Sequence, residues 1–421
     1  MSSVDVNAGD FVPLGSPEPG LTGEEMVARA RALVPLIVDQ ADRTEKQTFY
    51  SEEIHQAFLD NGLYMINHPK RYGGYELGLD TFYKVLVEIA SGDASTAWCF
   101  GIGTGHTIAL AAYWPEEVQQ EVLTQGPFIC PATWKPEGVA RRVEGGWEIT
   151  GTFHYASGSP YANYFWSHAL TEEPGEDGEP RIVQFLMPRS SWERLDDWGS
   201  TLGLRGSGSH SIRMEKAFAP DRFVILDSTF MDFDPAVSAV GAKLHGNPLY
   251  NGRPDSWFST EFTAFAVGLA KGGLQAYADL MNKSTPIPPI VTRSEDYDYQ
   301  LWYGEAYARV IAAESILDGA VRHMEKQSAN GTFAIEDDLL ATRLGTEVIA
   351  MCWETVHRYF ARTGGSAQMR AGTRIDRIFR DMAQLMSHNG FVLTGDVASR
   401  DLARLAFGVK PGAGTRSLLP R

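Results

Sequence analysis

The stretch VEGGWEITGTFHYASGS, residues 143–159, decides the fold class, because it is a clear β-pattern in a chain that otherwise favours helices. Apolar and polar residues alternate along it, and β-branched and aromatic side chains, which are typical of strands, are frequent. The segment EGGW, residues 144–147, predicts a tight hairpin turn between two strands. We therefore expect a β-domain over residues 126–235.

Both flanks of this region have the periodicity of helices. Upstream, a capping box at TGEE, residues 22–25, precedes apolar residues that recur at helical spacing. Downstream, the same spacing predicts long helices from residue 259 to residue 387 and a shorter one over Ser399–Phe407. The chain thus divides into a flexible N-terminal arm, a helical domain, a β-domain and a second helical domain. We expect these four parts at residues 1–21, 22–125, 126–235 and 236–421.

The composition excludes several classes of protein. The chain has 421 residues, 43% of them hydrophobic, which is typical of a soluble globular protein. A formal net charge of −16 disfavours nucleic acid as a partner, because an acidic surface repels the phosphate backbone. The three cysteines form no CxxC pair, so neither a cysteine-bound metal nor a disulfide framework is predicted. No apolar run approaches the ~18 residues of a membrane span, and no signal peptide is evident. A cytoplasmic protein is predicted.

Two glycine-rich motifs invite a phosphate-binding interpretation and do not satisfy it. GIGTGH has His106 where a dinucleotide loop has its third glycine, and it lies in a predicted helix, Ala94–Tyr113, rather than after a strand. RGSGSH, residues 205–210, lacks the GK[ST] ending of a phosphate loop. The sequence contains no HExxH and no GxSxG motif, so zinc and serine hydrolases are not indicated.

Four stretches match one known family in the same order and at similar spacing: IASGDASTAWCFGIGTGHTIAL (89–110), VEGGWEITGTFHYASGS (143–159), WGSTLGLRGSGSHSIRMEKAFAPDRFVI (198–225) and GGSAQMRAGTRIDRIFRDMAQLMSHNG (364–390). With the order of helices and strands, they resemble the acyl-CoA dehydrogenase superfamily, and within it the two-component, reduced-flavin-dependent monooxygenases. The resemblance spans nearly the whole chain after residue 22. It implies an α+β fold with an N-terminal helical domain, a central β-barrel or β-sandwich and a C-terminal four-helix bundle.

The fourth stretch separates two chemistries within the superfamily. The common acyl-CoA dehydrogenases have a catalytic glutamate directly before a glycine, shortly after an Arg-Asp pair. This chain has Arg380-Asp381 and Gly390, but Asn389 stands in the glutamate position and His388 precedes it. An amide is not basic near neutral pH, so Asn389 cannot remove a proton. The resembling monooxygenases have a histidine here, which implies an active-site role for His388. From residue type alone, His388 is a dipole partner at a helix end that Asn-Gly terminates.

Two more catalytic candidates follow from the resemblance. The family has a substrate-facing histidine where this chain has His106, and a neutral imidazole there can take a proton from a phenol or a ring nitrogen. The family also places a serine against the reactive edge of the flavin where this chain has Ser157. A core histidine and a serine in a strand-end turn are the plainer interpretations. Thr133 is expected to contact the flavin from the same side, with Tyr155 packed nearby.

The flavin phosphate is expected to be bound by arginine, because a guanidinium group suits bidentate phosphate binding. Arg293 and Arg370 are the candidates, and Arg370 follows Gly364-Gly365, which matches the cofactor-facing Gly-Gly loop of the superfamily. In the family such residues often come from a neighbouring subunit. A solvated surface arginine is the plainer interpretation of both. LGLRGSGS, residues 202–209, is expected to form a loop beside the substrate cavity.

The resemblance implies the oxygenase component of a two-component monooxygenase. A separate reductase would supply reduced FMN (FMNH2), with FAD as the alternative flavin. Reaction with O2 would form a flavin hydroperoxide that hydroxylates a small aromatic or heteroaromatic substrate. The family also implies a homotetramer and no metal. The substrate, and whether carbon, nitrogen or sulfur is oxygenated, stay open.

Two other hypotheses remain. An FAD-dependent acyl-CoA dehydrogenase, or a relative that oxidises CoA esters, would need a base other than Asn389. Glu261 lies close to where some dehydrogenases carry an alternative base, although a solvated carboxylate at a helix start is its plainer interpretation. The third hypothesis is a scaffold that kept the fold and lost catalysis. The joint presence of His106, Ser157 and His388 argues against it.

Overall fold

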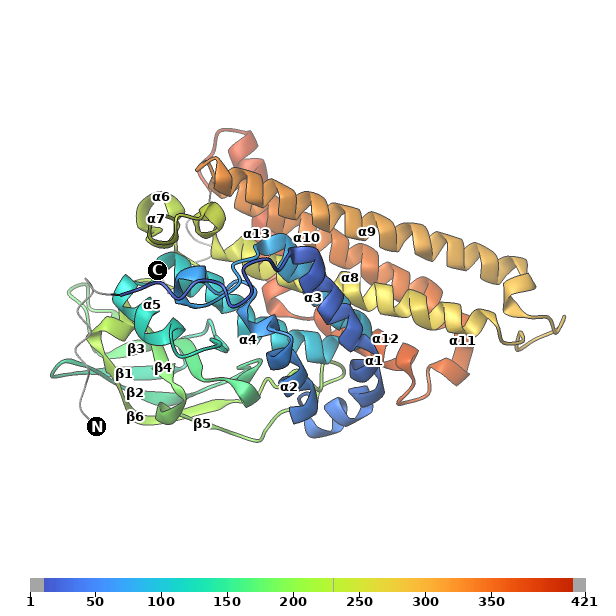
Figure 1. The fold of residues 1–421 in the computed structure, drawn as a ribbon, viewed down its shortest axis with the longest axis horizontal. Helices are drawn as coiled ribbons and strands as arrows, with labels where there is room; N and C mark the ends of the chain where they lie inside the picture. The colour runs from blue at the N-terminus through green and yellow to red at the C-terminus, as the bar shows by residue number, and fades with distance from the viewer. Residues whose placement is uncertain (1–10, 230, 412–421) are drawn as a thin grey trace.

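A mixed sheet lies between two groups of helices, in the order that the sequence predicts (Figure 1). The computed structural model describes residues 11–229 and 231–411. The N-terminal helices are α1 (Gly23–Gln47), α2 (Glu52–Asp60), α3 (Leu79–Gly92), α4 (Ala94–Tyr113) and α5 (Glu116–Leu123). The strands are β1 (Gly138–Val143), β2 (Gly146–Phe153), β3 (Tyr164–Pro174), β4 (Pro180–Pro188), β5 (Glu193–Arg194), β6 (Ile212–Pro220) and β7 (Val224–Leu226). The later helices are α6 (Pro235–Ser238), α7 (Gly241–His245), α8 (Pro254–Met281), α9 (Tyr297–Ala329), α10 (Ile335–Thr355), α11 (Ala361–Gln368), α12 (Arg374–Met386) and α13 (Asn389–Ala406).

The N-terminal segment joins the body before the first helix begins. Residues 11–21 form no helix or strand, yet the Leu14 amide donates to the Arg71 carbonyl over 3.0 Å, and Glu18 pairs with Arg29 at 2.6 Å. The predicted capping box at the start of α1 is confirmed. The first half of the predicted flexible arm lies outside the described residues, and its second half is held on the surface by these contacts.

The central strands form one seven-stranded sheet in the order β5-β6-β2-β1-β3-β4-β7. All pairs are antiparallel except β1 and β3, which run parallel. The predicted hairpin is present: Val143 pairs with Gly146, and Gly145 takes the left-handed backbone (φ 74°) that the turn requires. Where the prediction left a barrel or a sandwich open, the structure has a single sheet with β5 and β7 at its edges.

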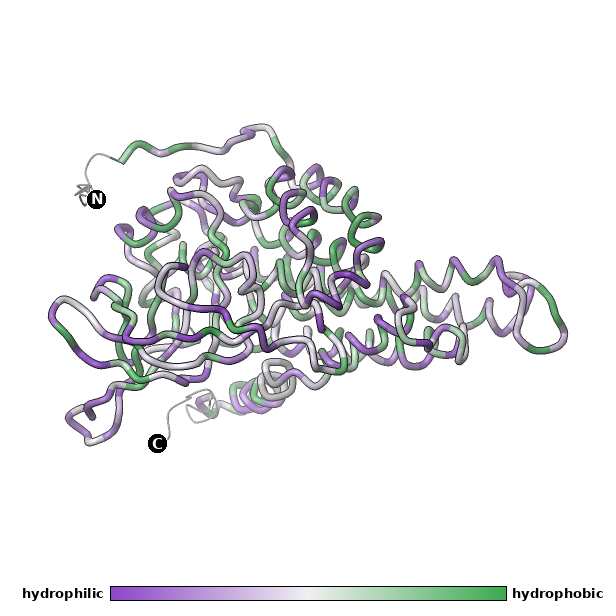
Figure 2. The backbone as a smooth tube through the Cα atoms, turned by 90° about the horizontal axis from the view of Figure 1, so that it is seen from below, coloured by the Kyte–Doolittle hydropathy of each residue, from purple (hydrophilic) through white to green (hydrophobic). Residues whose placement is uncertain are grey.

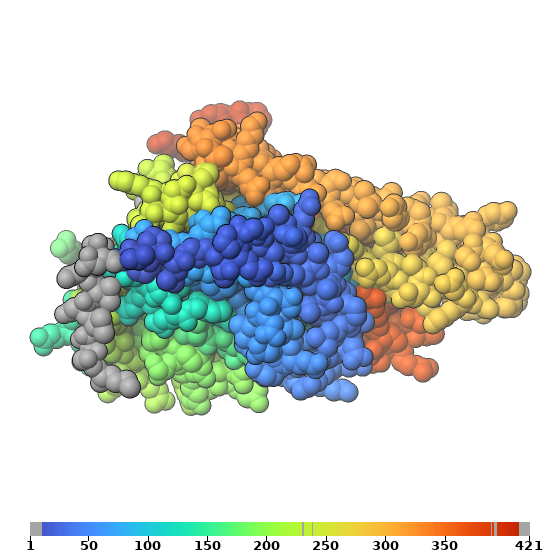
Figure 3. Space-filling view, viewed as in Figure 1, coloured from blue at the N-terminus to red at the C-terminus, as the bar shows by residue number. Residues whose placement is uncertain are grey.

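The long helices α8, α9 and α10 pack against one another, and α12 and α13 complete the C-terminal helical group. The far ends of α8 and α9, with the loop that joins them, extend beyond the rest of the molecule (Figure 3). Two predicted helix starts were wrong. Helix α8 begins at Pro254 rather than Ser259, because proline is well tolerated in the first turn. Helix α13 begins at Asn389 rather than Ser399.

The motif GIGTGH lies inside α4, which confirms that it is not a dinucleotide loop. Its glycines allow close packing instead. A Cβ atom added to Gly101 would lie 2.8 Å from the Phe265 ring, and one added to Gly105 would lie 1.9 Å from the Glu261 carboxyl. Both partners belong to α8, so these two glycines bring α4 and α8 together. This close crossing positions the candidate site.

Candidate active site

Helices α4 and α8 cross in opposite directions and form one wall of the site. Trp98 of α4 stacks on Phe262 with ring centroids 5.1 Å apart, and it lies 5.2 Å from Phe265. Two turns further along α4, the His106 ring lies 4.8 Å from Phe258. The three phenylalanines lie on one face of α8, because positions separated by three and four residues share a face. The wall is therefore aromatic and apolar.

His106 is buried on this wall with a defined tautomer. Its Nδ1 lies 2.8 Å from the carbonyl oxygens of both Ile102 and Cys130. Carbonyl oxygens only accept hydrogen bonds, so Nδ1 carries the proton and Nε2 carries the lone pair. Burial lowers the pKa of His106 to about 4, against weaker opposing effects of the two backbone hydrogen bonds. The ring is thus neutral near pH 7, as the proposed proton acceptor must be.

His388 lies between two helices. Helix α12 ends at Met386, and His388 directly precedes α13. The position just after a helix C-terminus agrees with the plainer interpretation, but the role of Asn-Gly as the helix stop was wrong, because Asn-Gly opens α13, whose N-terminal end disfavours a positive charge. The imidazole packs against Trp98 and Phe262, with centroids 5.1 and 5.0 Å away. Its buried Nδ1 has no hydrogen-bond partner among the described residues, and burial lowers the pKa of His388 to about 4.

Ser157 is joined to this wall by a hydrogen bond from Trp98. The indole Nε1 donates to the Ser157 Oγ over 3.0 Å. The same Oγ lies 2.7 Å from the Ser209 Oγ, which lies 2.7 Å from the Ser207 Oγ. Trp98 therefore contacts two of the three predicted catalytic residues, Ser157 and His388. The structure brings both around one indole ring, with His106 further along the same helix.

Sequence reasoning gave Ser207 and Ser209 no individual role in the site. The two serines belong to the predicted loop LGLRGSGS, which lies against Ser157 as well as against α12. The Leu204 amide of this loop donates to the Asp381 carboxylate over 2.7 Å. The high density of serines in this family-matched stretch was the sequence signal that could have predicted their place in the site.

Thr133 and Tyr155 have different surroundings. Thr133 is buried, its hydroxyl bonds to that of Ser167, and its amide donates to the Trp166 carbonyl over 3.1 Å. The Trp166 ring also approaches His106, at 6.2 Å, so Thr133 borders the site. Tyr155 is 71% exposed and has a left-handed backbone (φ 64°). It is not a core residue. Flavin contact by either residue stays a prediction.

The predicted phosphate ligands are remote from this wall within one chain. Arg293 lies between α8 and α9, at the projecting end of the molecule, and Gly364, Gly365 and Arg370 lie in and just after α11 (Figure 1). Arg293 is buried, its guanidinium carbon lies 5.3 Å from the Tyr299 ring centre, and its Nε has no partner within the described chain. Arg370 is exposed. Gly365 has a non-helical backbone (φ 52°) with open space where a side chain would project.

Glu261 is not the solvated helix-start carboxylate that its sequence context indicated. Because α8 begins at Pro254, Glu261 lies inside the helix, and only 2% of its surface is exposed. Its Oε2 is buried without a hydrogen bond in the described structure. Burial raises the pKa of Glu261 well above its ordinary range and so disfavours the ionised carboxylate.

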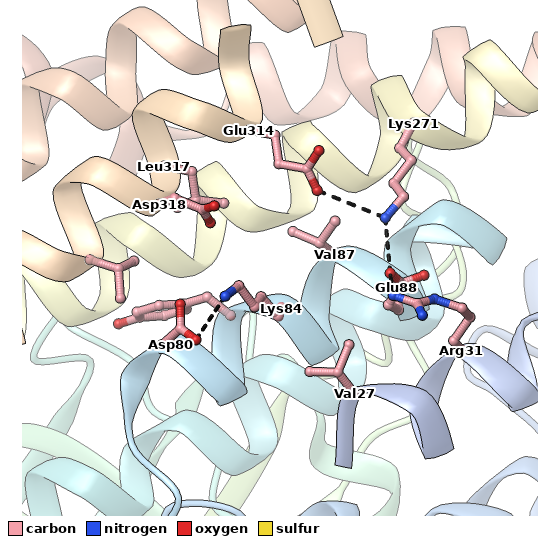
Figure 4. A pocket seen from close by; sticks show the side chains of 12 residues that line it. Val27, Arg31, Asp80, Lys84, Val87, Glu88, Lys271, Glu314, Leu317 and Asp318 are labelled. Atoms are coloured by element: carbon pink, nitrogen blue, oxygen red, sulfur yellow. Dashed lines mark hydrogen bonds and ion pairs between the residues drawn. The ribbon is translucent and has the colours of Figure 1, made fainter. Parts of the chain in front are cut away.

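A separate cavity lies away from this wall. It has a volume of about 150 Å³ and lies between α1, α3, α8 and α9, where ion pairs join Lys271 to Glu88 and Lys84 to Asp80 (Figure 4). None of the predicted site residues lines it. No cluster of three or more metal-ligating side chains occurs in residues 11–229 and 231–411. Within the same ranges, none of the helices combines the length and the hydrophobicity needed to cross a lipid bilayer.

Two family models match the helical parts of the chain. The model of the N-terminal domain of acyl-CoA dehydrogenase matches residues 23–125, and that of the C-terminal domain matches residues 261–392. The chain belongs to the acyl-CoA dehydrogenase superfamily. Together with the intervening sheet, these matches confirm the predicted order of helices, strands and helices.

Curated relatives within the superfamily are hydroxylases. The pigment production hydroxylase of Rhodococcus sp. (strain ATCC 21145) is 28% identical over 387 residues, which are 91% of this chain and 96% of that protein. The oxygenase subunit HsaA of a flavin-dependent monooxygenase from Rhodococcus jostii (strain RHA1) is 25% identical over 363 residues, 84% of this chain and 91% of its own. The chain is therefore similar over most of its length to oxygenase components of flavin-dependent hydroxylases and monooxygenases.

Solved structures share the fold over nearly the full length. XiaF from Streptomyces sp., in complex with FADH2 and glycerol, has a TM-score of 0.82 with 18% identity. The match covers 93% of this chain and 97% of XiaF. TdsC from Paenibacillus sp. A11-2, in complex with FMN and indole, has a TM-score of 0.75 with 19% identity, covering 92% of this chain and 99% of TdsC. These two relatives bind different flavins, so the choice between FMN and FAD stays open.

Proposed function

We propose that this chain uses O2 and reduced FMN, which a separate reductase supplies, to hydroxylate a small aromatic or heteroaromatic substrate. The observation that carries the proposal is the arrangement around Trp98. A buried serine, a neutral histidine and an aromatic helix face meet at one indole ring. Such a site excludes water and presents few polar groups, which suits an oxygen-transfer reaction whose chemistry a cofactor provides.

The residues present fit a flavin in two separate places. Ser157 and Thr133 offer hydroxyl groups to the ring, and the aromatic wall offers a flat apolar surface beside them. Arg293 and Arg370, with the Gly364-Gly365 turn, suit the phosphate. Because the arginines are remote from Ser157 within one chain, the proposal assigns them to the flavin of a neighbouring subunit. Bound reduced flavin would supply the activated oxygen, which no side chain provides.

His106 would act on the substrate. Its Nδ1 is committed to the carbonyl oxygens of Ile102 and Cys130, so Nε2 is the nitrogen that can accept a proton. A phenol O–H or an indole N–H directed at Nε2 becomes more acidic as the ring loses electron density to the incoming oxygen. Accepting that proton at this stage raises the nucleophilicity of the ring. A pKa of about 4 keeps the imidazole unprotonated near pH 7, so Nε2 retains the lone pair that accepts the proton.

His388 would help to close the site. Its buried Nδ1 lacks a partner in the described structure, and leaving such an atom unsatisfied costs about 1–3 kcal/mol. A bound flavin or substrate that hydrogen-bonds this nitrogen would remove that cost. In this role His388 is a binding group, and its neutral form can either donate or accept according to its tautomer.

Self-association is proposed from the projecting end of α8 and α9. The connecting loop exposes Ile287 and Ile290 by 72% and 63%, and the start of α9 exposes Tyr297 and Leu301 by 87% and 56%. Figure 2 shows a hydrophobic stretch at the tip of this loop. Burial of this surface by another copy, in a homotetramer, would also carry Arg293 towards a neighbouring active site.

Acyl-CoA dehydrogenation is the second candidate, and the state of Glu261 disfavours it. A catalytic base must be deprotonated, whereas burial raises the pKa of this carboxyl and disfavours its ionised form. We expect acyl-CoA thioesters with FAD to give no turnover. The Glu261→Gln variant should hydroxylate as well as the wild type does, since an amide replaces a neutral acid of the same size.

The experiment that tests the proposed function supplies the protein with FMN, NADH and an unrelated flavin reductase. A panel of phenols and indole is added under isotopically labelled O2, and products are analysed by mass spectrometry. We expect one labelled oxygen atom in at least one product. Oxygen consumption with no labelled product across the panel, together with turnover of an acyl-CoA ester, would replace the proposal by the second candidate.

A further inference from the structure

Four side chains form a hydroxyl chain at the centre of the site: Trp98, Ser157, Ser209 and Ser207. Three hydrogen bonds link them in this order, with lengths of 3.0, 2.7 and 2.7 Å. All four are buried, with exposed fractions of 4%, 8%, 5% and 1%. The indole N–H of Trp98 can only donate, so the first bond has a fixed direction and occupies one lone pair of Ser157.

The hydroxyl chain contains one donor proton more than its three hydrogen bonds use. The indole and the three hydroxyl groups supply four donor protons, whereas only three hydrogen bonds connect them. Neither Ser207 nor Ser209 has another side-chain hydrogen bond within residues 11–229 and 231–411. The surplus proton therefore resides on Ser207, Ser157 or Ser209, and the directions of the two serine bonds decide which.

The three arrangements differ in what they leave buried. If Ser157 donates to Ser209, and Ser209 to Ser207, the surplus proton is on Ser207, where 1% exposure leaves it without an acceptor. If Ser157 and Ser207 both donate to Ser209, the surplus proton is on Ser209, which is 5% exposed. If Ser207 donates to Ser209, and Ser209 to Ser157, the surplus proton is on Ser157, the most exposed member. An unsatisfied buried hydroxyl is costly, so this last arrangement is favoured as soon as a ligand acceptor reaches Ser157.

We infer that Ser209 and Trp98 are positioning residues that fill both lone pairs of Ser157 and thereby direct its single proton to an acceptor on the bound flavin. Ser207 sets the direction by donating to Ser209. This inference rests on the proposed function for the identity of the ligand. Neither serine touches the ligand, and both act through Ser157. Hydrogen-bond chains of this kind strengthen their terminal donor because each bond polarises the next.

The test is a double-mutant cycle on FMN binding, measured without turnover by fluorescence titration. Ser209→Ala should weaken FMN binding about three- to tenfold, as expected for one weakened hydrogen bond. The same change in a Ser157→Ala background should have no further effect, because the proton that Ser209 directs is then absent. An equal loss in both backgrounds, or no loss in either, would overturn the inference.

Ser211→Ala is the matched control, since Ser211 is buried nearby but bonds to His154 and Asp197 instead. It should leave FMN affinity unchanged. If Ser209→Ala does not fold, Ser207→Ala takes its place in the cycle, with a smaller loss expected in the same sense.

A flavin-free measurement separates this inference from the proposed function. The indole N–H resonance of Trp98 should shift in Ser209→Ala and not in Ser211→Ala, because Ser157, which accepts the indole N–H, loses its hydrogen bond with Ser209. If the wild type binds no FMN while this shift is seen, the proposed function fails and the hydroxyl chain is supported. If FMN binds tightly and the resonance does not move, the hydroxyl chain is disproved and the proposed function is retained.

Discussion

Two neighbouring regions of the site treat buried polar groups in opposite ways. Around Ser157, every side-chain oxygen has a partner, and the hydroxyl chain is complete apart from one proton. On the facing helices, the Nδ1 of His388 and the Oε2 of Glu261 are buried with no hydrogen bond in the described structure. The two regions share Trp98, which bonds to Ser157 and packs on His388.

The difference separates polar groups that are already hydrogen-bonded in the ligand-free protein from polar groups that still lack a hydrogen-bond partner. A paired hydroxyl is held in place before the ligand arrives, so it can orient a flavin without loss of order. An unpaired buried group destabilises the ligand-free fold, and this cost persists only if something offsets it. We therefore assign the serine region to cofactor orientation and the histidine region to ligand-dependent closure. The first three predictions act on the histidine side of the site, and the last one acts on Trp98, which both regions share.

His106→Ala should give the largest effect. Loss of a proton acceptor in the reaction is expected to lower the rate of product formation about a hundredfold or more. FMN affinity should not change, because the serine region is intact, and oxygen would be released as hydrogen peroxide. Product and peroxide yields per O2 measure this directly, with the exposed His154→Ala as a control. Normal coupling of oxygen use to product in His106→Ala would remove His106 from the chemistry.

Mild acid should destabilise the histidine region. His106 and His388 have a pKa of about 4 in the folded chain and about 6.5 when unfolded, so unfolding takes up protons between these values. Stability is therefore full above pH 6.5 and falls as the pH approaches 4. Each histidine should cost about 2 kcal/mol between pH 7 and pH 5. Urea unfolding of His388→Gln at the two pH values should show a difference smaller by that amount. An unchanged difference would mean that His388 is solvated.

Glu261→Leu should stabilise the chain at pH 7 by about 1–3 kcal/mol, because it removes a buried acid without a partner. The gain should grow as the pH rises above 4.5, since the unfolded carboxyl ionises there while the folded one stays protonated. Thermal unfolding of the variant and the wild type from pH 5 to pH 8 measures this gain in stability. Glu261→Gln should show a smaller gain. A destabilised Glu261→Leu would show that the carboxyl has a partner in solution.

Trp98→Phe should have the smallest effect on stability, about 1 kcal/mol for one hydrogen bond, because the aromatic packing is retained. It removes the only member common to both regions. If the regions are coupled through the indole, this variant should weaken FMN binding and also lower product yield. A variant that changes only one of these readouts would show that the two regions act independently.

Local patterns predicted the elements better than the contacts between them. The hairpin at residues 144–147 and the full extent of Ala94–Tyr113 were correct, because turn chemistry and helical spacing are local signals. The start of α13 was wrong, since Asn-Gly is a common stop signal that tertiary packing overrode here. The burial of Glu261 depends on the glycine opposite it on another helix, which no local pattern contains.

The site was predicted where the family resemblance reached and not beyond it. His106, Ser157 and His388 came from matched motifs, and the structure brings the last two together around Trp98. The bond between Ser157 and Ser209 spans 52 positions of the chain. Sequence spacing carries no information about such a pair, so its role emerged only from the folded arrangement.

The most direct test of the central claim is to mix the protein, saturated with reduced FMN under anaerobic conditions, with oxygenated buffer in a stopped-flow spectrometer. We predict a long-lived species that absorbs in the near ultraviolet and differs from oxidised FMN. It should decay faster in Ser157→Ala. Immediate appearance of oxidised FMN, at the rate of the free flavin and equal in both proteins, would contradict the assignment of this site to oxygen activation.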